Sequence, residues 1–326
     1  MALLSIENTS VTYDNDGQPV FAVRDVSFDI EAGRSVGIVG ESGSGKSTLM
    51  HAVLRILNPK TTKVTGRVTF NGEDILTMGE DRLTKLRWSE LAVVFQKSMN
   101  ALSPVHRVGS FMADVYRVHE PGAAKAQAMA RVTELLEMVN LPPRVAKLYP
   151  HELSGGMMQR VSIALSLMHN PRLLILDEAT TALDVVTQTQ ILGELKELEK
   201  KLNLTRIMVT HDMSVVASTC EEAAILYGGK LLEFGPVLTT LVSPAHPYTK
   251  CLLETFPDMV IDAGKQLRSI PGSLPDMRKP PGGCIFAPRC PSARVLCASI
   301  PPVNVRIGER HYAACHLVER EGGTNE

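Results

Sequence analysis

Apolar and polar residues alternate along several stretches of this chain, most clearly near its N-terminus. Residues 3–12 mix apolar and polar positions as an edge strand does, and a turn is predicted over 14–17. Apolar positions between 21 and 30 also alternate, and residues 66–72 have the pattern of a strand that ends in an Asn-Gly hairpin turn. The first third of the chain is therefore predicted to contain antiparallel strands.

Continuous apolar runs and helical spacing dominate the rest of the pattern. Buried strands are predicted at 35–39, 91–95, 172–178 and 206–210, and a hairpin at 223–234. Apolar residues at steps of three and four predict a long helix over 111–140, and another long helix is predicted to run to about 202. Strands that alternate with helices predict an α/β fold with a mostly parallel sheet and helices on both faces.

A glycine-rich loop separates the strand at 35–39 from a helical pattern. It reads Gly40, Glu41, Ser42, Gly43, Ser44, Gly45, Lys46, Ser47 and Thr48. Strand, glycine loop and helix are the context of a phosphate-binding loop, whose backbone N–H groups and helix dipole attract an anion. Lys46 would then reach the β- and γ-phosphates of a nucleotide, and Ser47 would hold Mg²⁺. The alternative is a turn that opens an ordinary helix.

Two acidic residues end the apolar strand at 172–178. Asp177 lies where a second Mg²⁺ contact is expected downstream of a phosphate loop, and Glu178 would face the γ-phosphate. There Glu178 would orient the attacking water or take its proton. The alternative is a pair of solvated acids at a strand end.

Composition limits the class of protein and its compartment. The 326 residues are 44% hydrophobic and 21% charged, as in a soluble protein with one large domain and an appendage or with two domains. The formal net charge of −1 gives no general attraction for nucleic acid. No apolar run approaches the ~18 residues of a spanning helix, and the N-terminal pattern predicts no secretory signal. We therefore expect a cytoplasmic chain that reaches a membrane only by docking to another protein.

The six cysteines are concentrated toward the C-terminus. They are Cys220, Cys251, Cys284, Cys290, Cys297 and Cys315. From residue 270 onward proline, glycine and cysteine dominate, so this segment cannot build a large apolar core. In a reducing compartment the clustering predicts a metal or iron–sulfur site that cross-links and stabilises the segment, in preference to disulfides.

Six motifs, in their order and spacing, resemble those of the ATP-binding-cassette (ABC) ATPases. They are Gly40–Thr48, Gln96, Leu153–Arg160, Leu173–Glu178, Thr181–Asp184 and His211. The resemblance implies a P-loop cassette over 1–245, with a mostly parallel core sheet, an antiparallel β subdomain and a helical subdomain at about 97–170. It implies that Gln96 contacts Mg²⁺ or water and that His211 bonds the γ-phosphate. Tyr13 resembles the aromatic residue that stacks on adenine, although a packing tyrosine is the alternative.

The resemblance also implies that one cassette cannot complete its own site. The signature residues Ser154, Gly155, Gly156 and Gln159 would act on ATP bound to a second cassette, and Asp184 would lie at the seam of the dimer. Two cassettes would close head to tail on two ATP molecules, and hydrolysis would release them. Two departures from the family pattern, Ala179 and Lys97-Ser98, remove no catalytic group, but the second would alter contact with a transmembrane partner.

The tail resembles that of the dipeptide and oligopeptide importer ATPases. The similar segments are 246–249, 269–272 and 284–291, within a predicted C-terminal domain at 246–326. The resemblance implies a [4Fe–4S] cluster held by Cys284, Cys290, Cys297 and Cys315. Four thiolates suit iron–sulfur or zinc, and the spacing lacks the paired C-x-x-C of common zinc folds. Iron–sulfur is favoured, while zinc and free structural thiols stay open.

The resemblance implies a peripheral ATPase subunit at the cytoplasmic face of the inner membrane. Its partners would be a second cassette, identical or related, two transmembrane permease subunits and an extracytoplasmic solute-binding protein, with no nucleic acid. The alternatives are a soluble ABC ATPase of DNA repair or translation, an exporter, and an importer of a nickel chelate or an oligosaccharide.

Overall fold

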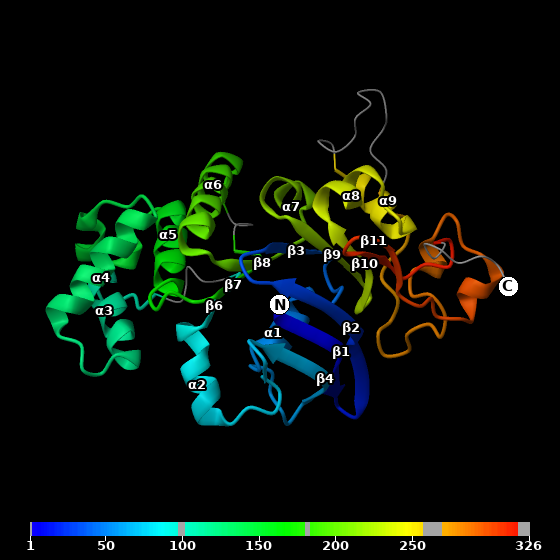
Figure 1. Ribbon diagram of the computed structural model, residues 1–326, viewed down its shortest axis with the longest axis horizontal. Helices are drawn as coiled ribbons and strands as arrows, with labels where there is room; N and C mark the ends of the chain where they lie inside the picture. The colour runs from blue at the N-terminus through cyan, green and yellow to red at the C-terminus, as the bar shows by residue number, and fades with distance from the viewer. Residues whose placement is uncertain (1, 97–101, 180–182, 257–268, 319–326) are drawn as a thin grey trace. The chain divides into compact units, whose positions relative to one another are not determined.

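The chain folds into two units, one made from both ends of the sequence and one from its middle. The first comprises residues 1–77 and 208–326, and the second comprises residues 78–207. The computed structural model describes residues 2–96, 102–179, 183–256 and 269–318 (Figure 1).

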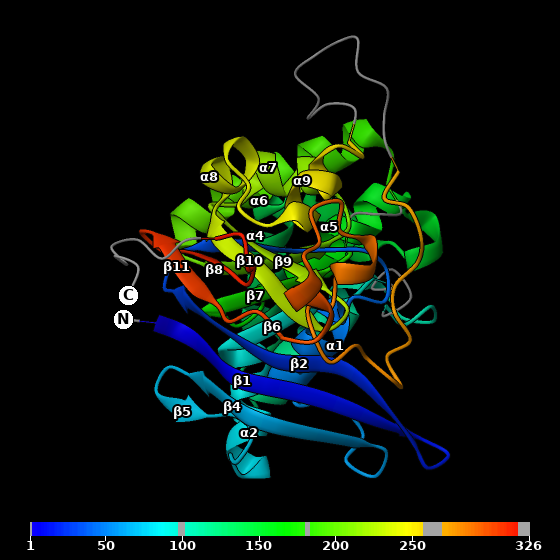
Figure 2. The same cartoon turned by 90° about the vertical axis from the view of Figure 1, so that its right-hand side faces the viewer.

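The alternating stretches near the N-terminus form an antiparallel sheet in the first unit. Its strands are β1 (Ala2–Asn15), β2 (Gln18–Glu31), β4 (Thr62–Phe70) and β5 (Glu73–Asp74), in the order β2-β1-β4-β5 (Figure 2). The Asn71-Gly72 turn joins β4 to β5 as predicted. The predicted end of the first strand was wrong by three residues, because Asn15 still pairs with Gln18 and only Asp16 and Gly17 form the turn.

A second sheet in the first unit combines segments that are far apart in sequence. Its strands in this unit are β3 (Ser35–Val39), β9 (Glu222–Tyr227), β10 (Lys230–Pro236), β12 (His311–Ala313) and β11 (Val305–Gly308), in that spatial order. β3 and β9 are parallel, and β9 and β10 form the predicted terminal hairpin. The C-terminal strands β11 and β12 continue this sheet from the edge of β10, so the expected small, separate Cys-rich domain is not confirmed.

The helices of the first unit are short. They are α1 (Lys46–Val53), α7 (Met213–Thr219), α8 (Val237–Val242) and α9 (Pro247–Leu253), with 3₁₀ turns η5 (Ala287–Arg289) and η6 (Val295–Ala298). Tyr227, Tyr248 and Phe286 pack edge to face in a core that also contains Cys284 and Cys297. The C-terminal segment therefore shares its apolar core with the sheet.

The second unit is mainly helical. Its elements are α2 (Glu80–Ser89), β6 (Leu91–Val94), α3 (Val108–His119), α4 (Lys125–Met138), η2 (Pro143–Lys147), η3 (Pro150–Glu152), α5 (Gly155–Ser166), β7 (Leu173–Asp177) and α6 (Val185–Leu202). β6 and β7 are parallel, and β8 (Thr205–Thr210) spans the boundary between the units. The single long helix predicted over 111–140 was wrong, because Pro121-Gly122 lies in a break between α3 and α4.

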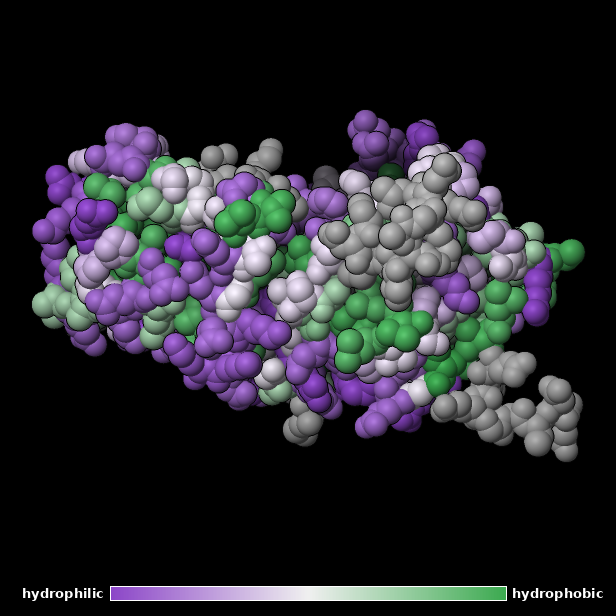
Figure 3. Space-filling view, turned by 90° about the horizontal axis from the view of Figure 1, so that it is seen from above, coloured by the Kyte–Doolittle hydropathy of each residue, from purple (hydrophilic) through white to green (hydrophobic). Residues whose placement is uncertain are grey.

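None of the helices that the structure describes combines the length and apolar character that a bilayer crossing needs. On the face seen from above in Figure 3, hydrophobic residues lie in separate patches among hydrophilic ones.

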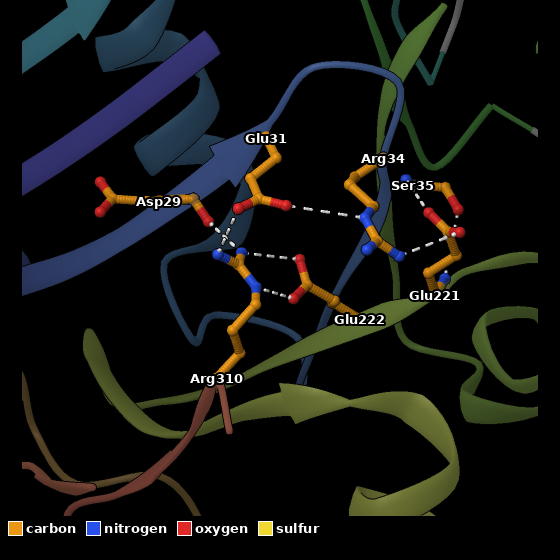
Figure 4. Close-up of polar contacts among 7 residues, drawn as sticks. All are labelled: Asp29, Glu31, Arg34, Ser35, Glu221, Glu222 and Arg310. Atoms are coloured by element: carbon orange, nitrogen blue, oxygen red, sulfur yellow. Dashed lines mark hydrogen bonds and ion pairs between the residues drawn. The ribbon is translucent and has the colours of Figure 1, made fainter. Parts of the chain in front are cut away.

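Arg310 attaches the C-terminal hairpin to two other strands (Figure 4). It lies between β11 and β12, and its guanidinium donates hydrogen bonds to both carboxylate oxygens of Glu222 on β9. It also forms an ion pair with Glu31 at 3.4 Å and donates to the backbone oxygen of Asp29 at 3.1 Å, both on β2. A short hairpin with little apolar surface of its own is thereby held by charge-assisted hydrogen bonds.

Glu233 on β10 connects this hairpin to the segment that precedes α9. Its buried carboxylate accepts hydrogen bonds from the backbone N–H groups of Ala245 and His246 at 2.9 Å. It also accepts from Thr249 Oγ1 at 2.6 Å and bonds His311 Nε2 at 2.8 Å. Burial by itself raises the pKa of Glu233, but these hydrogen bonds, led by that of His311, outweigh burial and lower the pKa below its usual value.

Replacing Glu233 with Gln is expected to lower the free energy of unfolding by about 2–3 kcal/mol, because an amide group then faces several donors. Because the folded-state pKa is lowered, the contribution of Glu233 is fully present above the unfolded pKa. It is lost as pH falls through the folded pKa. Urea unfolding at neutral and acidic pH measures both effects, with the exposed Glu309→Gln as the control. Equal stability of the two variants at neutral pH would contradict the role of Glu233.

Candidate nucleotide site and cysteine pocket

The glycine-rich loop at residues 40–48, called the phosphate loop below, follows the fully buried β3 and includes the first turn of α1. Gly45 has a φ of 95°, and a Cβ atom at that position would lie 2.3 Å from the backbone oxygen of Ala22. At Gly40, a Cβ atom would lie 2.0 Å from the backbone oxygen of Leu226. The tight packing of this loop therefore requires glycine at both positions.

Lys46 and Ser44 give the phosphate loop the character of an anion site. Nζ of the buried Lys46 donates to the backbone oxygens of Gly40 at 2.8 Å and Glu41 at 2.9 Å. Ser44 Oγ is buried, and no residue that the structure describes is hydrogen-bonded to it. A cation, a hydroxyl donor and the N-terminus of α1 together fit a phosphate group. The other predicted loop residues are Ser42, Gly43, Ser47 and Thr48.

Tyr13 and His211 belong to the same unit as the phosphate loop. Tyr13 lies on β1, and its hydroxyl donates a hydrogen bond to Thr48 Oγ1 in α1 at 3.3 Å. The structure thus brings the Tyr13 hydroxyl to the first turn of α1, and the stacking of Tyr13 on adenine stays a prediction. His211 is exposed and directly follows β8, and Asp212 caps α7 by accepting from the N–H of Ser214 at 2.8 Å.

Gln96 and Glu178 meet in the second unit. Gln96 follows β6, Glu178 follows β7, and these strands are parallel neighbours whose carboxyl ends lie at the same edge. Gln96 Nε2 donates a hydrogen bond to Glu178 Oε2 at 2.7 Å. Glu178 has a φ of 48°, a strained value for a residue with a side chain that is often found at functional sites. Asp177, the last residue of β7, is buried.

The signature residues occupy the start of α5. Ser154 is the N-cap, and its hydroxyl accepts from the N–H of Met157 at 3.3 Å. Ser154 and Gly155 are exposed, whereas Gln159 is buried.

Asp184 caps the neighbouring helix α6. It accepts from the N–H of Thr187 at 2.9 Å and from its hydroxyl at 2.7 Å, and these two bonds lower the pKa of Asp184. A Cβ atom on Gly156 would lie 2.7 Å from the side chain of Thr187. The starts of α5 and α6 are therefore in contact, and sequence reasoning had no signal for Thr187.

The predicted nucleotide-site residues are divided between the two units. Tyr13, the phosphate loop and His211 belong to the first unit, and Gln96, Asp177, Glu178, the signature and Asp184 belong to the second. Their joint action on a nucleotide stays a prediction. Thr181 and Ala182, and the departure at Lys97-Ser98, lie outside the described residues, whereas Ala179 lies within them.

The four predicted ligand cysteines line one small pocket, which we call the cysteine pocket. Its lining residues are His246, Pro247, Cys284, Ala287, Cys290, Ser292, Cys297, Cys315, His316 and Leu317. All six cysteines of the chain are free, and Cys220 and Cys251 do not line this pocket. The potential donors in the lining are thiols and imidazoles, without a carboxylate, which is a donor set that suits iron–sulfur or zinc.

Burial raises the pKa of three of these thiols, those of Cys284, Cys290 and Cys315, so each is protonated at neutral pH in the metal-free chain. Binding of a metal centre would have to displace these protons, so the affinity of the pocket for the metal would rise with pH. Within the described part of the chain, no group of three or more His, Cys, Asp or Glu side chains is arranged to hold a metal ion. The predicted metal centre is therefore not shown by the structure.

His246 contributes a polar group to the cysteine pocket that the sequence did not reveal. Its Nδ1 accepts a hydrogen bond from the N–H of Tyr248 at 3.0 Å, and burial lowers the pKa of His246 to about 4. The neutral ring therefore carries its proton on Nε2. That atom is buried and has no hydrogen-bond partner among the described residues. His246 also caps α9, and nothing in the sequence indicated its place in the cysteine pocket.

Comparison with known protein families assigns two regions of the chain. Residues 23–181 match the ABC transporter family, and residues 232–297 match the C-terminal region of oligopeptide/dipeptide transporters. The second match ends at Cys297, so Cys315 lies beyond it. The chain is 41% identical to the oligopeptide transport ATP-binding protein OppD of Escherichia coli over 305 residues, which cover 93% of this chain and 90% of that protein. It is 38% identical to the dipeptide transport ATP-binding protein DppD of Bacillus subtilis, covering 98% and 95%.

Solved structures support the fold. The dimeric bacterial ABC transporter cassette MJ0796 superimposes with a TM-score of 0.64 at 31% identity, covering 72% of this chain and 98% of that one. A structure of cbiO1 from Clostridium perfringens superimposes with a TM-score of 0.63 at 27% identity, covering 74% and 96%. The phosphate loop, the signature helix and these likenesses define an ATP-binding cassette. More narrowly, the chain belongs to the family of ATP-binding proteins of oligopeptide and dipeptide ABC transporters.

Proposed function

We propose that this chain is the ATP-hydrolysing subunit of an importer for peptides or a similar small solute. The observation that carries the proposal is the union, in one chain, of a complete cassette with a C-terminal region of the oligopeptide/dipeptide type. A cassette alone would suit transporters of many different solutes, whereas the C-terminal region favours a transporter of peptides. Relatives named for oligopeptide and dipeptide transport match nearly the whole chain, which supports peptides as the cargo.

In the proposed site, the phosphate loop binds the β- and γ-phosphates through Lys46 and its N–H groups, and Tyr13 stacks on adenine. The proposed Mg²⁺ contacts are Ser47, Gln96 and Asp177, and the ion would neutralise charge that develops on the phosphates. Glu178 takes a proton from the attacking water or orients it, and His211 bonds the γ-phosphate. The 2.7 Å contact between Gln96 and Glu178 supports this assignment, because the amide holds the carboxylate in one orientation.

We further propose that two cassettes, identical or related, close head to tail on two ATP molecules. The exposed positions of Ser154 and Gly155 at the start of a helix suit binding of a phosphate held by another chain. Asp184 would lie at the seam, and the helical subdomain at about 97–170 would dock two permease subunits at the cytoplasmic face of the membrane. An extracytoplasmic solute-binding protein would deliver the peptide.

A host strain that lacks its own peptide importer tests the proposed cargo. Expressing this chain with its permease and binding-protein partners is expected to restore uptake of labelled peptides, whereas a Lys46→Ala chain is expected to fail. Restored uptake of an oligosaccharide or a nickel chelate without any peptide uptake would contradict the assignment.

We also propose that the cysteine pocket holds a [4Fe–4S] cluster through Cys284, Cys290, Cys297 and Cys315. Support comes from the convergence of these four thiols on one pocket, although they are spread over a long stretch of irregular chain. A cluster extends over several atoms and therefore needs a wider arrangement of thiolates than a single ion does. When bound, the cluster would cross-link the C-terminal segment. His246 also lines this pocket, and its buried Nε2–H, which has no hydrogen-bond partner among the described residues, would be available to donate to a cluster sulfur.

Anaerobically purified protein is expected to be brown and to contain about four irons per chain. Cys297→Ser should lose the colour and most of the iron, whereas Cys220→Ser, which changes a cysteine outside the pocket, should keep both. Iron analysis and the visible absorption spectrum measure the two variants in parallel. A colourless protein that contains one zinc per chain would contradict the cluster.

A further inference from the structure

Residues of the C-terminal segment hold the phosphate loop at Glu41. Arg289 Nη1 donates to both carboxylate oxygens of Glu41 at 3.0 Å. The backbone N–H of the same Glu41 donates to the hydroxyl of Tyr248, in α9, at 3.1 Å. Side chain and backbone of this loop residue are thus both held by residues that lie more than two hundred positions later in the chain.

Arg289 is itself held firmly. Its side chain is only 6% exposed, and Nη1 also donates to the hydroxyl of Tyr227 at 3.1 Å. Nε donates to the backbone oxygen of Pro271 at 2.7 Å, and Nη2 donates to that of Ile270 at 3.0 Å. A guanidinium that donates hydrogen bonds from Nε, Nη1 and Nη2 is held in one orientation, because it cannot rotate without losing several charge-assisted hydrogen bonds.

Glu41 matters to the nucleotide because of what its own backbone contacts. Its carbonyl oxygen, together with that of Gly40, accepts from Lys46 Nζ, the group that reaches the phosphates. A shift of Glu41 would therefore move the loop backbone and change the place of the lysine. Displacements of about 1 Å in a positioned site are enough to weaken its function.

The same turn that carries Arg289 also reaches the cysteine pocket. Arg289 is the last residue of η5 and directly precedes Cys290, whose thiol lines the pocket. The N–H of Ala287, the first residue of η5, donates to the backbone oxygen of Cys284 at 3.0 Å, which fixes the turn on its other side. The turn η5 therefore links the phosphate loop, through Arg289, with the cysteine pocket, through the adjacent Cys290.

We propose that Arg289 is a positioning residue of the nucleotide site, which holds the phosphate loop in its binding shape through Glu41. The C-terminal segment that distinguishes this family is then part of the machinery that binds ATP, and not only an appendage. The proposal rests on ATP binding by the phosphate loop, and it is independent of what occupies the cysteine pocket.

Steady-state ATP hydrolysis by the full chain, assembled with its partners, tests this inference. Arg289→Met is expected to raise KM for MgATP about tenfold while kcat stays within about twofold, because loop geometry affects ground-state and transition-state binding alike. Arg289→Lys, which keeps the charge but loses the fork, should fall between Met and wild type. The control is Arg278→Met, which removes an exposed arginine paired with Asp276 in the same segment and should leave both KM and kcat at their wild-type values.

A double-mutant cycle separates positioning from general destabilisation. Glu41→Gln should reproduce the rise in KM, and the double variant Glu41→Gln, Arg289→Met should be no worse than either single one. Additive losses, or a wild-type KM in Arg289→Met, would overturn the proposal. If Arg289→Met does not fold, Glu41→Gln decides alone: a raised KM supports the proposal, and an unchanged KM overturns it. Lack of MgATP binding by the wild-type chain would instead refute the nucleotide site itself.

Discussion

Glu178→Gln is expected to reduce the rate of ATP hydrolysis at least about a hundredfold, the usual loss when a general base is removed. ATP affinity should persist, because Lys46 and the phosphate loop are unchanged and the amide can still accept from Gln96 Nε2. The variant should therefore accumulate as an ATP-bound closed dimer, since in the proposed cycle ATP binding closes the dimer and hydrolysis opens it.

Phosphate release and size-exclusion chromatography with MgATP measure both parts of this prediction. Glu197→Gln, on an exposed position of α6 in the same unit, is the matched control and should hydrolyse ATP at the wild-type rate. Hydrolysis by Glu178→Gln at that same rate would remove Glu178 from its proposed role.

Lys46→Ala is expected to weaken MgATP binding at least about a hundredfold, because the variant loses the buried ammonium that is proposed to contact the β- and γ-phosphates. The loop also loses the hydrogen bonds from Nζ to Gly40 and Glu41, so its shape without nucleotide becomes less defined. Titration with a fluorescent ATP analogue measures the affinity.

The control for this lysine is Lys60→Ala, which changes an exposed lysine in the same unit and should bind normally. Undiminished affinity in Lys46→Ala would contradict the assignment of the phosphate loop. The same titration, performed on Glu178→Gln, separates the two predictions, because only the lysine variant should lose binding.

Local chemistry explains which parts of this structure could be read from the sequence. The phosphate loop could be predicted because a strand, its glycines and a following helix lie next to one another. The Asn71-Gly72 turn could be predicted because these two residues adopt positive φ with little strain. Gln96 and Glu178 could each be placed directly after a predicted strand, but their hydrogen bond to each other was not predicted.

Long-range polar pairs could not be predicted in the same way. Arg289 and Glu41 are 248 positions apart, and Glu233 and His311 are 78 apart, with no periodic pattern to connect them. The strands β11 and β12 escaped prediction because they span four and three residues in a segment rich in proline and cysteine. The break between α3 and α4 was missed because the apolar spacing that predicted one helix lies in and next to α4, C-terminal to Pro121-Gly122.

The central claim is that ATP hydrolysis by a pair of these cassettes drives peptide uptake. It is tested most directly by rebuilding the transporter from this chain, its permease subunits and its binding protein in lipid vesicles and measuring entry of a labelled peptide. The account predicts peptide accumulation that requires MgATP and is lost with Glu178→Gln. Accumulation that proceeds equally without ATP, or equally with the Glu178→Gln chain, would contradict it.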